Sequence, residues 1–228
     1  MSAETSEGSV SIGKLILIPA LITLAVTIIR LVGELQHWNP TLFNPSAGGG
    51  GALVGITWLV PILGIYFAIK LCRAGAGPER VGRVFLFVLL AIVVFFALFA
   101  IGAALKLQPG SPVFAAIGAA AAIISIAIMA KPWPALFKTL LAYGYAARIP
   151  VAILMIFAIH GNWGTHYDVA PPGEFPEMNW LAKWVLIGAF PQLLGWISFT
   201  VVFGSLFGAI AAALTTRGKA REHASATS

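Results

Sequence analysis

Arg148 is the residue whose chemistry stands out most from its surroundings, because it lies inside an apolar stretch long enough to cross a bilayer. A charged side chain at that depth costs from roughly 3 to more than 10 kcal/mol unless something pairs with it. A guanidinium can donate to both oxygens of a carboxylate or phosphate. The sequence therefore predicts a site for an anionic small solute or lipid at Arg148. Two structural roles are the alternatives, namely tying two helices together through carbonyl groups and snorkelling to the membrane edge.

Polar groups close to Arg148 in the sequence support such a site. Pro150 has no N–H, so the carbonyl of Ala146 loses its intrahelical partner, and the hydroxyls of Tyr143 and Tyr145 lie at similar depth. We therefore expect both tyrosines to assist in substrate binding.

Three more polar residues within predicted spans are candidate substrate-binding residues. Arg30 and Glu34 are one helical turn apart and can pair along one face. Gln192 can line a cavity or bond two helices together. Because the spans hold two arginines and a single acid, one positive charge needs a ligand, water or the carboxylate of a partner protein.

Histidines near one predicted membrane boundary form a second candidate site. His37 and His160 end two spans, and His166 and Asp168 follow in a loop. These residue types would suit zinc, copper, iron or a haem, although their spacing matches no compact ligand motif. Hydrogen bonding to loops and a pH-responsive role are the alternatives.

Motifs for catalysis are lacking, so no catalytic residue is predicted. The sequence has no nucleophile elbow, HExxH, C-x-x-C or nucleotide-binding fingerprint. Its single cysteine, Cys72, excludes a disulfide or a multi-cysteine metal site within the chain. We expect no cofactor, with a metal or haem as the alternative. The net charge of +6 does not indicate nucleic-acid binding, because the cations flank apolar segments.

The elements that must position these residues are membrane-spanning helices. Hydrophobic residues make up 59% of the chain and charged residues only 10%, so lipid must be the main solvent. A helix crosses the hydrocarbon core in about 20 residues. Six segments of one bundle qualify: about 12–36, 51–72, 81–105, 112–131, 135–160 and 181–214. The predicted fold class is all-α and polytopic.

Lysine and arginine positions predict the orientation of these six spans. Ten cations fall on one side and only Lys106 and Lys183 on the other, so both termini are expected in the cytoplasm. The domain 12–216 then lies between a cytoplasmic tail, 1–11, and a disordered tail, 217–228. We expect a multi-pass protein of the cell inner (plasma) membrane.

The last apolar segment is too long for one perpendicular crossing, since 34 residues reach ~51 Å. We expect Trp180–Trp184 to lie along the interface and Pro191 to bend the chain into the membrane. A short re-entrant piece is the alternative.

Three functions are compatible with this pattern. The first is binding or transport of an anionic solute or lipid through Arg148. The second is an accessory subunit of a membrane complex, whose partner supplies the missing acid. The third is a metal or haem redox protein built on the histidines. Gly204 and Gly208 form a GxxxG pair that permits close packing, either within the bundle or in a homo-oligomer.

Overall fold

The computed structural model describes residues 10–108, 110–170 and 178–226, with side chains up to residue 215. The described chain is helical and contains no strand, which confirms the all-α class. Its helices are α1 (Ile12–Leu35), the short η1 (Ala47–Gly49), α2 (Leu59–Arg73), α3 (Val81–Ala104), α4 (Pro112–Met129), α5 (Pro134–Gly161), α6 (Trp180–Lys183), η2 (Trp184–Ala189), η3 (Pro191–Gly195) and α7 (Trp196–Ala226).

Five helical stretches are long and apolar enough to cross a membrane, so the chain is a multi-pass membrane protein. They coincide with the first, third, fourth, fifth and sixth predicted spans. Local signals set several of their ends. Ser111 caps α4 by accepting a hydrogen bond from the N–H of Phe114, at 3.2 Å. Asn162 ends α5 in the left-handed conformation, with φ of 47°.

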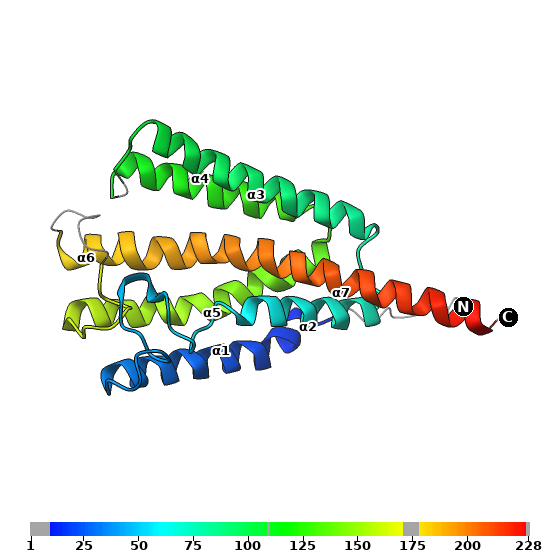
Figure 1. Cartoon of the computed structure of the whole chain (residues 1–228), viewed down its shortest axis with the longest axis horizontal. Coiled ribbons are helices and arrows are strands. Elements are labelled where there is room, and N and C mark those ends of the chain that lie inside the picture. Colours follow the sequence, from blue (N-terminus) through cyan, green and yellow to red (C-terminus); the bar gives the residue numbers. More distant parts are fainter. Residues whose placement is uncertain (1–9, 109, 171–177, 227–228) are drawn as a thin grey trace, which may run out of the picture.

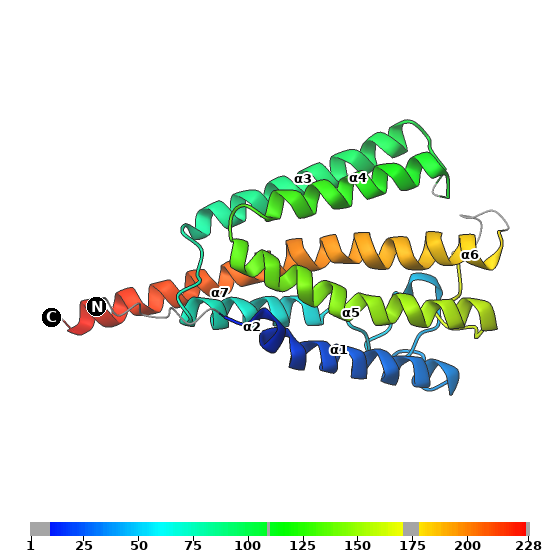
Figure 2. The same ribbon diagram turned by 180° about the vertical axis from the view of Figure 1, so that it is seen from behind.

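The helices form one bundle around α7, which packs against α2, α3, α4 and α5, while α1 packs mainly on α5 (Figure 1). The start of α1 and the end of α7 lie at the same end, here the terminal end. The opposite end, here the loop end, carries the segments 36–58 and 162–170 (Figure 2). This agrees with an even number of passes. Which end faces the cytoplasm stays a prediction.

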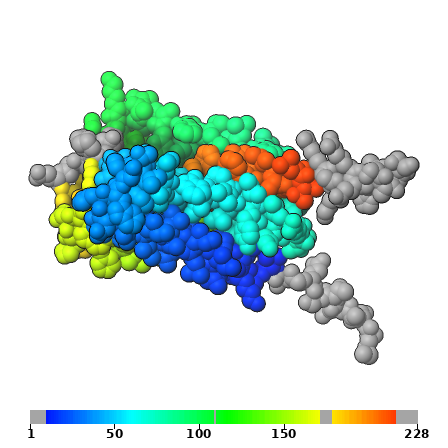
Figure 3. Space-filling view, turned by 60° about the horizontal axis from the view of Figure 1, so that its bottom comes forward, coloured from blue at the N-terminus to red at the C-terminus, as the bar shows by residue number. Residues whose placement is uncertain are grey.

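The second predicted span, 51–72, is wrong in its first part. The helix α2 has only 15 residues, and residues 50–58 before it are not helical. The N–H groups of Leu53 and Val54 bond back to the carbonyls of Thr41 and Leu42, so this part of the chain is held against its own preceding loop. Figure 3 shows 36–58 covering the loop end on the face that also carries α1 and α2. The second predicted span is therefore a half-length helix preceded by an irregular segment, and it is not one of the five stretches that qualify as membrane-spanning.

The expected bend at Pro191 is also wrong. Residues 180–215 form one continuous helical stretch, which Figure 1 shows as a straight rod. Two π-helical segments, η2 and η3, lie on either side of Phe190, and their wider turns accommodate the proline. The Trp184 indole donates to the carbonyl of Ala152 on α5, at 2.9 Å, so Trp184 packs within the bundle instead of along the interface.

The structure describes the two predicted tails only in part. Residues 1–9 of the N-terminal tail and residues 227–228 lie outside the described residues. The segment 217–226, expected to be disordered, continues α7 as helix up to Ala226. No proline interrupts the chain there.

The GxxxG pair acts within the chain. Gly204 faces Gly64 of α2, and a Cβ on Gly208 would lie 3.2 Å from the carbonyl oxygen of Gly64. The backbones of α2 and α7 thus touch, which holds α2 firmly in place below the irregular segment.

Candidate functional site

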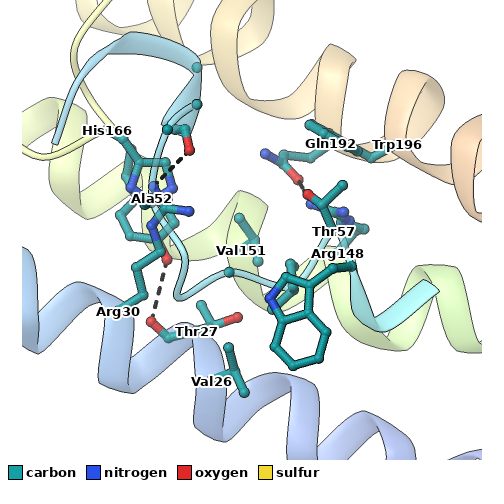
Figure 4. Close-up of a pocket in the computed structure, with 18 residues that line it drawn as sticks. Val26, Thr27, Arg30, Ala52, Thr57, Arg148, Val151, His166, Gln192 and Trp196 are labelled. Carbon is teal, nitrogen blue, oxygen red and sulfur yellow. Dashed lines mark hydrogen bonds between the residues drawn. The ribbon is translucent and has the colours of Figure 1, made fainter. Parts of the chain in front are cut away.

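A cavity of about 320 Å³ lies in the loop-end half of the bundle, within the size range of small-molecule sites. Its walls come from five parts of the chain (Figure 4). The polar side chains that line it are Thr27, Arg30, Thr57, Arg148, His166, Tyr167 and Gln192. Val26, Ile56, Trp58, Val151 and Trp196 supply the apolar wall.

Arg148 lies at the middle of α5 and is 4% exposed. Its Nη1 donates to Oε1 of Gln192 at 3.1 Å, and its guanidinium carbon lies 4.4 Å from the ring centre of Trp196. Figure 4 shows these three side chains together at one side of the cavity. No carboxylate among the described residues forms an ion pair with Arg148.

The other N–H groups of Arg148 face accessible space. The guanidinium has five N–H donors, and among the described residues a single hydrogen bond, to Gln192, engages it. Throughout the described side chains, no buried nitrogen or oxygen is without a hydrogen-bond partner. The free donors of Arg148 therefore reach the cavity that this residue lines.

The N-terminus of α2 opens on the same cavity. Gly55, Ile56, Thr57 and Trp58 all line it, and α2 runs from there toward the terminal end (Figure 1). Within the described part of the chain, no hydrogen bond engages the N–H groups of Gly55, Ile56 and Thr57. These N–H groups belong to the segment before α2, and the positive end of the helix dipole adds to their attraction for an anion. Broken helices place their N-termini at anionic substrates in transporters in the same way.

Arg30 and Glu34 pair as their spacing predicts, with 2.8 Å between Nε and Oε1. Both are buried, at 7% and 3% exposure. Arg30 also donates to the carbonyls of Asn44 and Gly49. Glu34 accepts from the backbone N–H of His166 at 2.9 Å, and its Oε1 lies 2.6 Å from the Nδ1 of His166. This cluster joins α1 to both loop-end segments.

Gly49 is required where the loop meets this cluster. Its φ of 68° is in the left-handed region, and a Cβ there would lie 2.7 Å from the His166 ring. The glycine loop therefore packs closely against the imidazole.

Burial lowers the pKa of the His166 imidazole; the hydrogen bond to Glu34 opposes this effect, and the positive charge of Arg30 adds to it. Burial also raises the pKa of Tyr167, whose hydroxyl donates to the carbonyl of Thr27 at 3.3 Å. His166 is thus held neutral near pH 7, and Tyr167 remains a phenol.

The predicted site residues divide into two groups. Arg148, Arg30 and Gln192 line the cavity, with Glu34 bonded directly behind Arg30. Tyr143 instead bonds Thr23 of α1 at 2.8 Å, deep in the helix packing, and Tyr145 is 36% exposed. Neither tyrosine lines the cavity, and neither does Ala146.

The predicted metal ligands have separate partners. Asp168 accepts from the N–H groups of Gly164 and Thr165, and His166 contacts Glu34. His160 packs on Trp180, and His37 is exposed. Among the described residues, no group of three or more histidine, cysteine or acidic side chains is arranged to hold a metal ion.

Sequence reasoning assigned only some of the cavity-lining residues to the anionic site, and three of those it left out are instructive. Trp196 follows Gln192 by one turn, a spacing that could have indicated it. His166 was considered as a metal ligand, a partner for loop hydrogen bonds or a pH-responsive group, but it was not assigned to the anionic site whose cavity it lines. Thr57 carries no sequence signal, because it lies in a stretch that reads as regular helix.

Comparison of the chain with protein-family models, with curated proteins and with solved structures found no match. The site is therefore interpreted from its own geometry. An unpaired guanidinium, an amide and a helix N-terminus around one small cavity are suited to hold an oxyanion.

Proposed function

We propose that this membrane protein binds an anionic oxygen group, either of a small solute or of a lipid headgroup, in the cavity at Arg148. The carboxylate or phosphate would take the free N–H groups of Arg148 and the donors before α2. The observation that carries the proposal is that Arg148 is buried, has no acidic partner among the described residues and lines the same cavity as the segment before α2. Such a charge is costly in a bilayer unless an anion or water accompanies it.

The surroundings of Arg148 favour a ligand over the carboxylate of a partner subunit. The cavity at Arg148 is lined by five segments of its own chain, and only 4% of Arg148 is exposed. A partner helix on the outside of the bundle could not reach it. With the terminal end in the cytoplasm of a plasma-membrane protein, the cavity would face outward, and binding there would be the first step of uptake.

Arg148→Gln is expected to weaken anion binding about tenfold to hundredfold, since hydrogen bonds to a charged group contribute ~1.5–3 kcal/mol. Gln keeps a polar group beside Gln192, so the fold should persist. Binding is measured as thermal stabilisation of the protein in nanodiscs by acetate, methanesulfonate and sulfate. A second arm compares nanodiscs of phosphatidylglycerol with nanodiscs of phosphatidylcholine, which separates a lipid headgroup from a free anion.

Tyr143→Phe is the matched control, because it changes the same helix outside the cavity. It removes the hydrogen bond to Thr23 and should lower stability by about 1 kcal/mol, with anion affinity unchanged. Equal anion binding by Arg148→Gln and the wild-type protein would contradict the proposed function.

A further inference from the structure

The net charge of the groups at the cavity wall is +1. Arg30 and Glu34 cancel each other at 2.8 Å, and Arg148 has no acid beside it among the described residues. His166 also lines the cavity and is neutral near pH 7. A single negative charge would balance this wall, whereas a divalent anion would leave one charge in excess in a poorly solvated site.

His166 has the geometry to supply a second positive charge. Glu34, paired with Arg30, is a carboxylate that only accepts, so the proton of the neutral imidazole lies on Nδ1, facing Glu34. Nε2 then carries the lone pair. No contact within the described chain engages Nε2, and buried unpartnered nitrogens are absent there, so Nε2 is accessible.

Groups from every neighbouring element act on that nitrogen. From α1, Glu34 favours a charged imidazole and Arg30 opposes it. From its own loop, Asp168 favours the charged form, and the ring of Tyr167 packs at 3.8 Å. Arg148 on α5 lines the same cavity, and Gly49 adds no charge. Because Arg30 lies beside the imidazole, the empty site disfavours protonation of His166, and a bound dianion reverses that balance.

We propose that the cavity takes a monovalent oxyanion alone and a divalent oxyanion together with one proton, which binds Nε2 of His166. This inference rests on the proposed function and adds to it the charge class of the ligand and its coupling to protons. In the step itself hydronium or a buffer acid transfers its proton to the Nε2 lone pair and leaves as water or the buffer base, the anion enters, and no covalent bond of the anion changes.

The coupling gives each anion a distinct pH dependence. A dianion raises the proton affinity of His166, so by linkage protonation raises the affinity for the dianion. Sulfate affinity should increase as the pH falls, by up to ~10-fold per pH unit where one proton is taken up. Methanesulfonate, which carries one charge, should show a much weaker dependence. Neither anion titrates between about pH 5.5 and 8, so the dependence reports the protein.

His166→Asn removes the titrating group and keeps an amide N–H at the position of Nδ1, facing Glu34. Sulfate binding should become nearly independent of pH in this variant and should be weaker at low pH. Methanesulfonate binding should change little. His160→Asn is the matched control, since His160 is exposed and packs on Trp180 outside the cavity, and it should keep the pH dependence of sulfate.

If His166→Asn does not fold, a second measurement, on the wild-type protein, tests the same inference. Calorimetric titration of the wild-type protein with sulfate, in two buffers of different ionisation enthalpy, should report close to one proton taken up per sulfate and far less with methanesulfonate. Binding of both anions without proton uptake, or a sulfate slope that persists in a folded His166→Asn protein, would overturn the inference and leave the proposed function standing. Binding of neither anion would count against both.

Discussion

Replacing Glu34 with alanine should destabilise the protein by about 3–5 kcal/mol, because it leaves a buried charge without its partner. Glu34 is the acceptor for Arg30 and for two donors of His166, at 2.6–2.9 Å. Without Glu34, the guanidinium of Arg30 has no ion-pair partner, and the loop 162–170 loses its hydrogen bonds to α1. The free energy of unfolding in bicelles, measured by steric trapping, tests this value.

Two further variants separate charge from packing. Glu34→Gln keeps an oxygen for Arg30 and should cost clearly less than Glu34→Ala. The double variant Arg30→Met/Glu34→Leu removes both charges. Its loss of unfolding free energy should be smaller than the sum of the losses of Arg30→Met alone and Glu34→Leu alone. Additive losses in this cycle would mean that the two charges are not coupled as the geometry indicates.

The same cluster shows how far the sequence alone could lead. Pairing of Arg30 with Glu34 followed from a spacing of four residues on a helix. The contact of Glu34 with His166 spans 132 positions of the chain, and no local pattern encodes it. An i,i+4 rule describes neighbours on one helix, whereas contacts between elements depend on how these elements pack.

For the site at Arg148, the sequence likewise predicted single residues but not their contacts with one another. Arg148 and Gln192 each stood out as polar groups in apolar segments, and the structure brings them to 3.1 Å. The tyrosines near Arg148 also seemed suitable from sequence distance, but Tyr143 turns toward α1 and bonds Thr23 instead. Residues at a similar depth in the membrane can lie on different faces of the same helix, as Tyr143 and Arg148 do.

The second predicted span shows where hydropathy predicts a helix that does not form. Residues 51–58 are apolar enough to extend the following helix, and composition alone therefore predicts a full span. Three glycines near its start adopt positive φ, at Gly48, Gly49 and Gly51, which a helix does not allow. Covered by protein and beside a cavity, irregular backbone can persist at membrane depth. A break of this kind is what places a helix N-terminus beside Arg148.

Gly64→Ala should lower the stability by about 2–3 kcal/mol, although alanine favours helix formation over glycine by ~1 kcal/mol. A Cβ on Gly64 would meet the carbonyl oxygen of Gly204 and lie 2.8 Å from its Cα. Backbone atoms cannot rotate away as a side chain can, so α2 and α7 would have to separate. Because α2 begins at the cavity, this separation should weaken anion binding as well.

Two other glycines provide a graded comparison for this close contact. A Cβ on Gly204 would meet the end of the Leu140 side chain, at 2.6 Å, which can move, so Gly204→Ala should cost less than Gly64→Ala. Gly82 of α3 has nothing within 4 Å of a Cβ, and Gly82→Ala should be neutral or slightly stabilising. Thermal unfolding of the three variants in one detergent gives the order directly. Should Gly64→Ala unfold at the same temperature as Gly82→Ala, the backbones of α2 and α7 would not be in contact, and the support for a fixed α2 N-terminus would be lost with that contact.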